Sequence, residues 1–367
     1  MPAGGFRLTR PGASRYSPVH YSLAGKGVVL KSVVLLSLIA LSETQLGKLQ
    51  AVSSQLEVHQ MTDVAANDLP QALRDQIEVV LGGGAQIHDP ALFPSLKWVQ
   101  IHSAGIDRLL ETPLWTSPVT ITTASGIHAT PIAERTMAMM LAFRANLPEM
   151  WQLKQQAIWP QDRWGMFSSP DLRNSTLGIV GYGAIGGELA RQASALGMRV
   201  LAFNRSGERR PMDTYIEPGF GDQDMHIPER VFGTDQLETM LRECDHVVIL
   251  LPATPATHHL INDRALGCMK STAFIYNFGR GSVIDEQALI AALQSGQIAG
   301  VGLDVFEQEP LPADSPLWQM PNVIITPHVG GMASNYNDRL IDLFAKNLHN
   351  YLAGQPLMNQ VDREHGY

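Results

Sequence analysis

The stretch LGIVGYGAIG at residues 177–186 decides the fold of this chain. Its apolar beginning predicts a buried strand, the glycines follow the pattern G-x-G-x-x-G, and a helical pattern comes directly after them. In such a turn Gly181 allows the sharp reversal, Gly183 removes the side chain that would block a pyrophosphate, and Gly186 lets the helix approach the strand. The N-terminus of the helix adds N–H donors and partial positive charge. The stretch therefore predicts dinucleotide binding, and a purely structural glycine turn is the alternative.

The next strand lacks the carboxylate that usually binds the adenine ribose. That acid is expected about 20 residues after the glycines, at the end of the second strand. Here the second strand, residues 198–203, ends in Asn204-Arg205-Ser206. A carboxylate would repel a 2′-phosphate, whereas a guanidinium can bind one through paired hydrogen bonds. We therefore expect NADP(H) as the preferred cofactor, with NAD(H) possible; a solvated basic loop is the alternative reading.

The composition is that of a globular protein with two domains. The chain has 367 residues, of which 45% are hydrophobic. Its net charge of −8, without a long basic run, argues against nucleic acid as the main partner. Cys244 and Cys268 are too few and too far apart for a metal cluster or a disulfide framework, so we expect no metal and a cytoplasmic location. The apolar run at 32–39 is too short to span a bilayer, so no membrane partner is expected.

Strands and helices alternate in two series, one from residue 28 and one from residue 177. This alternation is typical of parallel sheets covered by helices. We therefore expect an α/β protein with two Rossmann-like or flavodoxin-like domains and a cleft between them. The expected boundaries are a flexible N-terminal tail at 1–27, a substrate-binding domain at 28–130 plus 332–360, and a dinucleotide-binding domain at 131–331.

Three segments leave alternatives open. The tail 1–27 contains no acidic residue and resembles either a frayed end or a transit peptide. The helix at 131–146 is apolar on almost every face, which favours either a core helix that bridges the domains or the contact between two copies in a homodimer. The segment 207–233 is long and irregular for a connection between strand and helix, so it is either a flap beside the adenosine end of the cofactor or a disordered insertion.

Polar residues follow three later strands at their carboxyl ends, where open α/β sheets bind ligands. Arg280 lies between two glycines, which would give a substrate carboxylate close access to its guanidinium. His328 lies between a strand end and a Gly-Gly turn, and Glu309 follows another strand. A histidine near a carboxylate is the usual arrangement for proton transfer close to neutral pH. His328 is therefore the candidate acid, and His128 is a further candidate for lining the cleft; a surface arginine and structural histidines are the alternatives.

Taken together, these phrases resemble the D-isomer-specific 2-hydroxyacid dehydrogenases over residues 28–352. The resemblance depends on five phrases and on their order in the chain. They are VGYGAIG at 180–186, LPATPAT at 251–257, NFGRGSVID at 277–285, LDVFEQEPL at 303–311 and PHVGG at 327–331.

The resemblance implies a role for individual residues. Arg280 would hold the carboxylate and carbonyl of a 2-keto acid, while His328, paired with Glu309, would give its proton to the carbonyl oxygen as hydride arrives from the nicotinamide. Asp304 would contact the nicotinamide carboxamide. The substrate loop would comprise Ser103, Ala104 and Gly105. The implied cofactor-binding residues are Gly181, Tyr182, Gly183, Ala184, Ile185, Gly186, Asn204, Arg205, Ser206, Leu251, Pro252, Thr257, Phe278, Gly279, Asp304 and Gly330.

The implied activity is reduction of a small 2-keto acid, such as glyoxylate or hydroxypyruvate, to the D-2-hydroxy acid by NADPH. A phosphoglycerate dehydrogenase-like enzyme is one alternative. A non-catalytic, dinucleotide-sensing protein similar to the family's corepressors is another. Turnover of a panel of 2-keto acids would separate the enzymes from the non-catalytic class.

Overall fold

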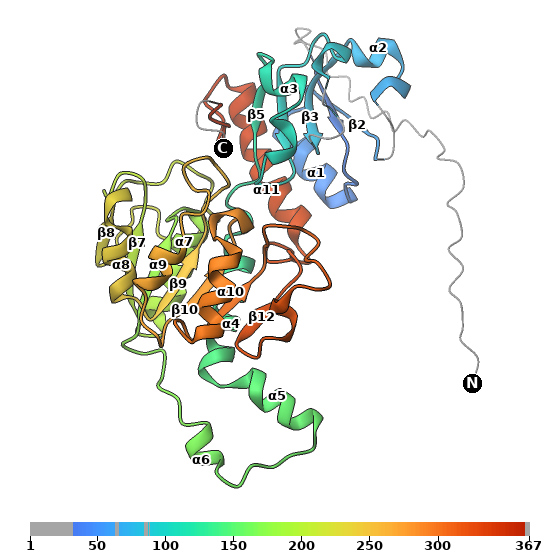
Figure 1. The fold of residues 1–367 in the computed structure, drawn as a ribbon. Coiled ribbons are helices and arrows are strands. Elements are labelled where there is room, and N and C mark those ends of the chain that lie inside the picture. Colours follow the sequence, from blue (N-terminus) through green and yellow to red (C-terminus); the bar gives the residue numbers. More distant parts are fainter. Residues whose placement is uncertain (1–31, 63–65, 84–86, 88, 364–367) are drawn as a thin grey trace, which may run out of the picture. The chain divides into compact units, whose positions relative to one another are not determined.

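The computed structural model describes residues 32–62, 66–83, 87 and 89–363 (Figure 1). The chain divides into two compact units. Unit 1 comprises the described residues up to His102 together with Asp107–Thr122, and unit 2 comprises Ser103–Ile106 together with the described residues from Thr123 onward. The predicted tail 1–27 lies outside the described residues. The predicted boundaries at 28–130 plus 332–360 and at 131–331 stay a prediction.

Unit 1 is built on a five-stranded parallel sheet in the order β2-β1-β3-β4-β5. This is the flavodoxin-like order 2-1-3-4-5. The strands are β1 (Val33–Ser37), β2 (Leu56–Gln60), β3 (Ile77–Gly82), β4 (Trp98–Ile101) and β5 (Thr120–Thr122), and the helices are α1 (Glu43–Val52), α2 (Gln71–Arg74) and α3 (Pro113–Thr116). Helix α1 begins with a capping box, in which Ser42 and Gln45 satisfy each other's backbone N–H groups.

Unit 2 is built on a seven-stranded parallel sheet in the order β12-β11-β10-β9-β6-β7-β8. Its strands are β6 (Thr176–Val180), β7 (Arg199–Phe203), β8 (Arg230–Phe232), β9 (His246–Ile249), β10 (Phe274–Asn277), β11 (Gly300–Leu303) and β12 (Val323–Ile325). The strand order reverses between β6 and β9, and such a switch point is where open sheets bind dinucleotides. The expected α/β class with two parallel sheets is confirmed.

Unit 2 contains the helices α4 (Ala129–Arg144), α5 (Leu147–Gln155), α6 (Arg163–Met166), α7 (Ala184–Ala195), α8 (Leu237–Glu243), α9 (Asp263–Gly267), α10 (Glu286–Ser295) and α11 (Tyr336–Leu352). Five of them, α4, α7, α8, α9 and α10, cover the two faces of this sheet (Figure 1). One core cluster lies under α4 and α7 and the other under α8, α9 and α10. Because β6 and β9 are buried on both faces, their sequences are continuous apolar runs rather than alternating ones.

Helix α4 packs against α7 and buries ten of its sixteen residues. The next two helices, α5 and α6, project away from the sheet (Figure 1). Three tryptophans are largely exposed here: Trp151 on α5 at 60%, Trp164 on α6 at 79%, and Trp159 in the loop between them at 77%. In the described ranges no helix is both long and apolar enough to cross a bilayer.

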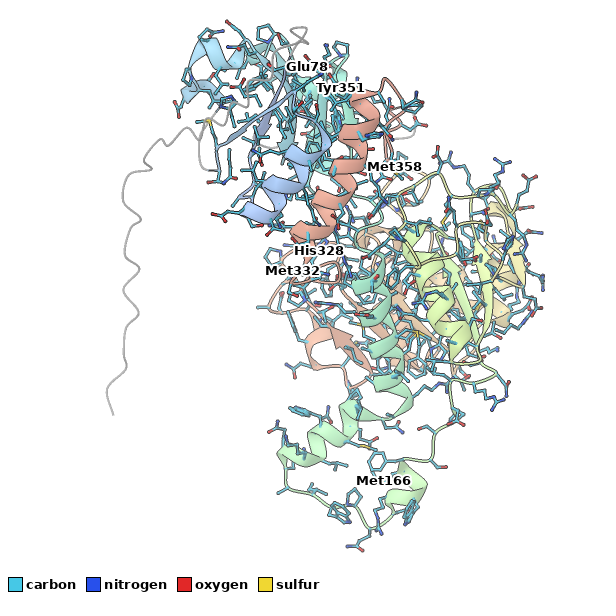
Figure 2. All side chains as sticks on the ribbon, turned by 180° about the vertical axis from the view of Figure 1, so that it is seen from behind. Glu78, Met166, His328, Met332, Tyr351 and Met358 are labelled. Atoms are coloured by element: carbon cyan, nitrogen blue, oxygen red, sulfur yellow. The ribbon has the colours of Figure 1, made fainter. Side chains whose placement is uncertain are left out.

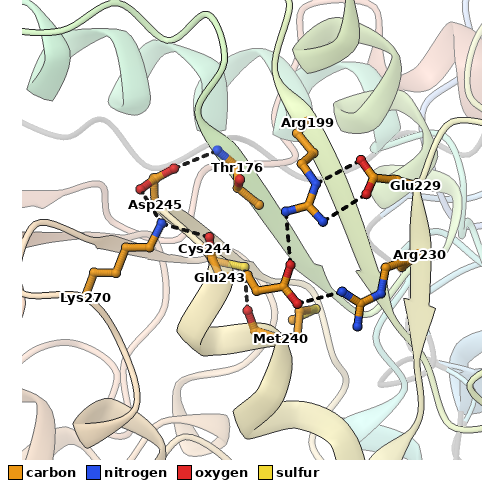
Figure 3. A network of polar contacts seen from close by, with 9 residues as sticks. All are labelled: Thr176, Arg199, Glu229, Arg230, Met240, Glu243, Cys244, Asp245 and Lys270. Atoms are coloured by element: carbon orange, nitrogen blue, oxygen red, sulfur yellow. Dashed lines mark hydrogen bonds and ion pairs between the residues drawn. The ribbon is translucent and has the colours of Figure 1, made fainter.

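An ion-pair network joins the amino-terminal ends of β7 and β8 to the end of α8 (Figure 3). Arg199 pairs with Glu229 at 2.9 Å and with Glu243 at 3.0 Å, and Arg230 pairs with Glu243 at 2.7 Å. The hydrogen bond from Arg199 holds the pKa of Glu229 below its usual range. This network holds β7 and β8 at their starts and leaves the carboxyl edge of the sheet to the candidate site.

Candidate functional site

Each of the three glycines of the predicted turn occupies its position for a different steric reason. Gly181 has a φ of +103°, and a Cβ there would lie 3.0 Å from the Leu250 carbonyl carbon, at the end of β9. A Cβ on Gly186 would lie 3.0 Å from the Gly181 oxygen, so only glycine lets α7 sit this close. A Cβ on Gly183 would meet nothing within 4 Å, and the extended backbone at this position suits any residue. No atom of the described protein therefore requires glycine here. The protein therefore leaves space at Gly183, which fits a pyrophosphate at the N-terminus of α7.

The irregular segment 207–233 is packed against this turn. The Tyr182 hydroxyl donates a 2.6 Å hydrogen bond to Asp222, and the Gly221 N–H donates over 2.9 Å to Glu188. Tyr182 and Glu188 are both buried, and burial raises the pKa of Tyr182, so its hydroxyl stays a donor. Of the two interpretations left open, the structure favours an ordered connection beside the dinucleotide turn and not a disordered insertion.

The carboxylate of Glu188 is wholly buried on α7 and stays ionised. Burial raises its pKa, but hydrogen bonds from Arg191 and from the Gly221 N–H outweigh burial, so the pKa lies below its usual range. Arg191 donates to this carboxylate over 2.6 Å and 2.9 Å. The charged carboxylate of Glu188 therefore holds the segment 207–233, called the inserted segment below, against α7.

The residues that follow β7 divide into structural and exposed side chains. Asn204 accepts from the Gly207 N–H at 2.7 Å and donates to the Glu208 carbonyl at 2.9 Å, so it shapes its own turn. Arg209 donates to backbone carbonyls of the inserted segment, including that of Met225. Arg205 is exposed at the carboxyl end of the strand. Contact of its guanidinium with a 2′-phosphate stays a prediction.

Arg280 follows β10 in a loop that other backbone segments approach closely. Its Nη1 donates to the Gly279 carbonyl at 3.0 Å, and the Asn277 side chain bonds both the Gly279 N–H and the Arg280 carbonyl at 3.0 Å. A Cβ on Gly279 would lie 2.5 Å from the Leu251 oxygen, and one on Gly281 would lie 1.9 Å from the Phe306 carbonyl. The glycines thus make room for neighbouring backbone, which is a different reason from the predicted access for substrate.

Asp304 follows β11 and organises the loop after β12. Its carboxylate accepts hydrogen bonds from the Thr326 hydroxyl at 2.5 Å, the Val329 N–H at 3.0 Å and the Gly330 N–H at 2.8 Å. Its backbone carbonyl also accepts from the His328 N–H at 2.8 Å. Asp304 is buried. Contact of its carboxylate with the nicotinamide carboxamide stays a prediction, and what the structure shows is a carboxylate that shapes the histidine loop.

His328 and Glu309 are brought together. The imidazole Nδ1 lies 2.6 Å from Glu309 Oε2, while Oε1 of the same carboxylate accepts from the Phe306 N–H at 3.1 Å. An ionised carboxylate can only accept, so Nδ1 carries the hydrogen and Nε2 is the nitrogen left for proton exchange. His328 has a left-handed φ of +52°, which is uncommon for a residue other than glycine. The loop then leads through Met332 to α11 (Figure 2).

Further predicted site residues lie in loops around these side chains. The Ser103 hydroxyl donates to the Gly105 carbonyl at 2.9 Å, and the Ser103 carbonyl accepts from the Ala124 N–H, so this loop belongs to unit 2. The Thr257 hydroxyl donates to the Pro252 carbonyl at 2.7 Å and closes its own loop. Leu251 lies directly beside Gly181, and Phe278 beside Gly330.

The prediction from sequence missed Asp222, Glu188 and Thr326, whose side chains hydrogen-bond other parts of the site. Local sequence does not show that Asp222 reaches Tyr182 or that Glu188 reaches Gly221, because these partners lie 40 and 33 residues away. Thr326 directly precedes the quoted phrase PHVGG, and its place after a strand is a usable signal. Among the described residues, no three of His, Cys, Asp and Glu gather in a way that suits a metal ion.

Comparison with known proteins agrees with this geometry. Residues 137–330 match the family described as D-isomer specific 2-hydroxyacid dehydrogenase, NAD binding domain. A glyoxylate reductase of Thermofilum pendens is 34% identical over 76% of this chain and 78% of its own. A glyoxylate/hydroxypyruvate reductase B of Yersinia pestis is 33% identical over 85% of this chain and 93% of its own.

Solved structures are similar over most of the chain. A D-isomer specific 2-hydroxyacid dehydrogenase from Xanthobacter autotrophicus, in complex with NADPH and MES, has a TM-score of 0.75 at 27% identity and covers 92% of this chain and 100% of its own. An NADPH-dependent glyoxylate/hydroxypyruvate reductase from Sinorhizobium meliloti, in complex with NADP and sulfate, has a TM-score of 0.72 at 27% identity with the same coverage. The dinucleotide turn, the paired histidine and carboxylate and these similarities define an oxidoreductase. This chain belongs to the D-isomer specific 2-hydroxyacid dehydrogenase family.

Proposed function

We propose that this enzyme reduces a small 2-keto acid, such as glyoxylate or hydroxypyruvate, to the D-2-hydroxy acid with NADPH. The observation that carries the proposal is the 2.6 Å contact between His328 and Glu309, in the loop that Asp304 organises. The relatives named as glyoxylate or hydroxypyruvate reductases support the substrate class.

The protein's own part in the reaction is to hold the keto acid and to move one proton. When bound, the nicotinamide cofactor supplies the hydride that adds to the carbonyl carbon. Glu309 fixes the ring of His328 through Nδ1, so Nε2 is the atom that gives a proton to the carbonyl oxygen. Protonation of the oxygen removes the negative charge that would otherwise build up there.

Arg280 would bind the carboxylate of the keto acid. A guanidinium presents five N–H donors in a planar fork, so the hydrogen bond from Nη1 to the Gly279 carbonyl is compatible with a bidentate carboxylate. The backbone of residues 103–105 would add N–H donors from the substrate loop. Binding both ends of a small keto acid orients the carbonyl for hydride transfer, which is a large part of the rate gain available without a metal.

NADPH is proposed over NADH because the strand end carries Asn204 and Arg205 instead of a carboxylate. The neighbouring structures described as NADPH or NADP complexes support this preference. Arg205→Ala should therefore weaken NADPH much more than NADH. Equal losses for the two cofactors would contradict the assignment of Arg205.

The test of the whole proposal is a substrate panel. The purified protein is mixed with NADPH and glyoxylate, hydroxypyruvate or a larger 2-keto acid, and the absorbance of the reduced nicotinamide is followed. Glu309→Gln should lower kcat, because an amide can donate as well as accept and no longer fixes the hydrogen on Nδ1 of His328. No turnover of any 2-keto acid would favour the non-catalytic alternative, and an unchanged kcat would remove Glu309 from the mechanism.

A homodimer is proposed as the working form. Helix α4 uses most of its surface within unit 2 and leaves Leu141 exposed, while the segment from α5 to α6 exposes Trp151, Trp159 and Trp164. Large exposed aromatic side chains on a projecting segment are typical of an interface. Light scattering should give twice the chain mass for the wild type, and replacement of the three tryptophans by serine should give the single mass. A monomeric wild type would refute the dimer.

A further inference from the structure

His128 lies at the amino end of α4 and contacts Tyr336, the first residue of α11. Its Nε2 is 3.1 Å from the Tyr336 hydroxyl, and the two rings meet edge to face with centroids 5.2 Å apart. Burial raises the pKa of Tyr336 to about 12, so the hydroxyl keeps its hydrogen at neutral pH. The pair therefore joins the starts of two helices that are 208 residues apart in the chain.

The ring of His128 also lies directly against the loop of the candidate acid. A Cβ built on Gly331 would be only 2.6 Å from the imidazole Cδ2, a distance that real Cβ atoms do not reach. On the other side of the same loop, a Cβ on Gly330 would be 2.6 Å from the Asp304 carboxylate and 2.8 Å from the Phe278 ring. The two glycines after the candidate acid are thus enclosed from both sides.

A third contact holds the end of this loop. Arg135, on α4, donates from Nη2 to the Met332 carbonyl at 3.0 Å. Two side chains of the α4 region, His128 and Arg135, therefore hold positions 331 and 332. Asp304 holds positions 329 and 330 from the sheet through its carboxylate.

We propose that His128, held by Tyr336, is a positioning residue that sets the place of His328 for proton transfer. The inference rests on the proposed role of His328. His128 acts through the loop: its ring limits how far Gly331 can move, and only two residues separate Gly331 from His328.

The physical basis is the steep dependence of proton transfer on geometry. A displacement of about 1 Å at a reacting group can cost on the order of a hundredfold in rate. The His328–Glu309 contact is short, at 2.6 Å, so a shift of the loop lengthens it at once. The glycine turn of α7, where the pyrophosphate is expected to bind, does not contact Gly331, so the Kd of NADPH should change much less than kcat.

The test is a double-mutant cycle on Gly331 and His128. Gly331→Ala forces a methyl group into the imidazole, so kcat with NADPH and glyoxylate should fall roughly tenfold to a hundredfold, while the Kd of NADPH changes by about twofold at most. His128→Ala should lower kcat less. The kcat of the double variant should match that of His128→Ala and exceed that of Gly331→Ala, because removal of the ring makes room for the methyl group.

Conservative variants separate positioning from a merely structural role. His128→Gln, whose amide can still bond the Tyr336 hydroxyl, should keep more of kcat than His128→Leu, with equal urea midpoints for both. If Gly331→Ala does not fold, the comparison of these two variants decides. Equal kcat values for His128→Gln and His128→Leu would overturn the proposal. A kcat of Gly331→Ala equal to wild type, or no recovery in the double variant, also overturns it.

Crystal structures distinguish failure of this inference from failure of the proposed function. In Gly331→Ala the distance from Nδ1 of His328 to Glu309 should exceed the wild-type value, and in the double variant it should return. This readout needs no turnover. If no 2-keto acid of the panel is turned over, only the proposed activity is refuted. If the distance is unchanged in Gly331→Ala, only the positioning role of His128 is refuted.

Discussion

The buried His246 should make unit 2 unstable in mild acid. It is the first residue of β9 and is fully inaccessible. Its Nε2 accepts a 3.2 Å hydrogen bond from Arg144, and its Nδ1 lies 3.1 Å from the Tyr276 hydroxyl. Burial, together with the nearby charge of Arg144, lowers the pKa of His246 from 6.5 to about 3. The imidazole is therefore neutral in the folded protein, and protonation at Nε2 would break the bond with Arg144.

The sign of the pH effect follows from the two pKa values. The folded pKa lies below the unfolded one, so the unfolded chain takes up the proton first as the pH falls. The stability that His246 contributes is complete above pH 6.5, declines below it, and is fully lost near pH 3. A pKa difference of this size corresponds to roughly 5 kcal/mol in total, of which about 2 kcal/mol is lost between pH 7.5 and pH 5.

The assay is urea unfolding followed by circular dichroism at pH 7.5 and pH 5.0, with the slope checked for constancy. His246→Gln cannot take up the proton, so its loss of stability between the two pH values should be about 2 kcal/mol smaller than that of wild type. Arg144→Gln should lose less stability than wild type between the two pH values, because one cause of the lowered pKa of His246 is removed. His349→Gln, on an exposed position of α11, controls for the loss of one histidine. Equal losses in wild type and His246→Gln would refute the reasoning.

Three further predictions address the turn, the inserted segment and the ion-pair network. Gly183→Ala should fold as wild type, because its Cβ meets no protein atom, yet should bind NADPH about tenfold or more weakly by fluorescence titration; equal affinity would place the pyrophosphate elsewhere. Asp222→Asn weakens the acceptor of the Tyr182 hydroxyl, so limited proteolysis within 208–229 should accelerate, and an unchanged cleavage rate would show that this bond does not hold the segment. Glu243→Gln should lower stability by about 1 kcal/mol or less, an effect that added salt should reduce; a salt-independent loss would point to packing instead.

The two sheets could be predicted from sequence because their central strands are long and apolar. β1, β3, β6 and β9 are buried throughout, and most residues of each are apolar. β5 and β8 are not predicted. Each has three residues, of which at least one is polar, whereas the equally short edge strand β12 is wholly apolar and is detected.

The paired acid and carboxylate could also be predicted, since His328 and Glu309 each follow a strand and adjacent parallel strands end at one edge of the sheet. The glycines around Arg280 show what sequence could not supply. The sequence marks Gly279 and Gly281 as special positions, but it does not show why glycine is needed there. The reason is that the backbone of Leu251 and Phe306 approaches them from other loops. Such contacts depend on how distant segments pack, and no local pattern encodes them.

Asp304 connects these observations. A carboxylate that accepts three hydrogen bonds from one loop has little remaining freedom, so its main effect is on the shape of that loop. The loop leaves β12, takes a left-handed turn at His328 and passes between Asp304 and His128. A left-handed backbone at a non-glycine residue costs free energy and persists only when its surroundings enforce it. The contacts from the sheet on one side and from α4 on the other supply that enforcement, and the side chain they hold is the proposed proton donor.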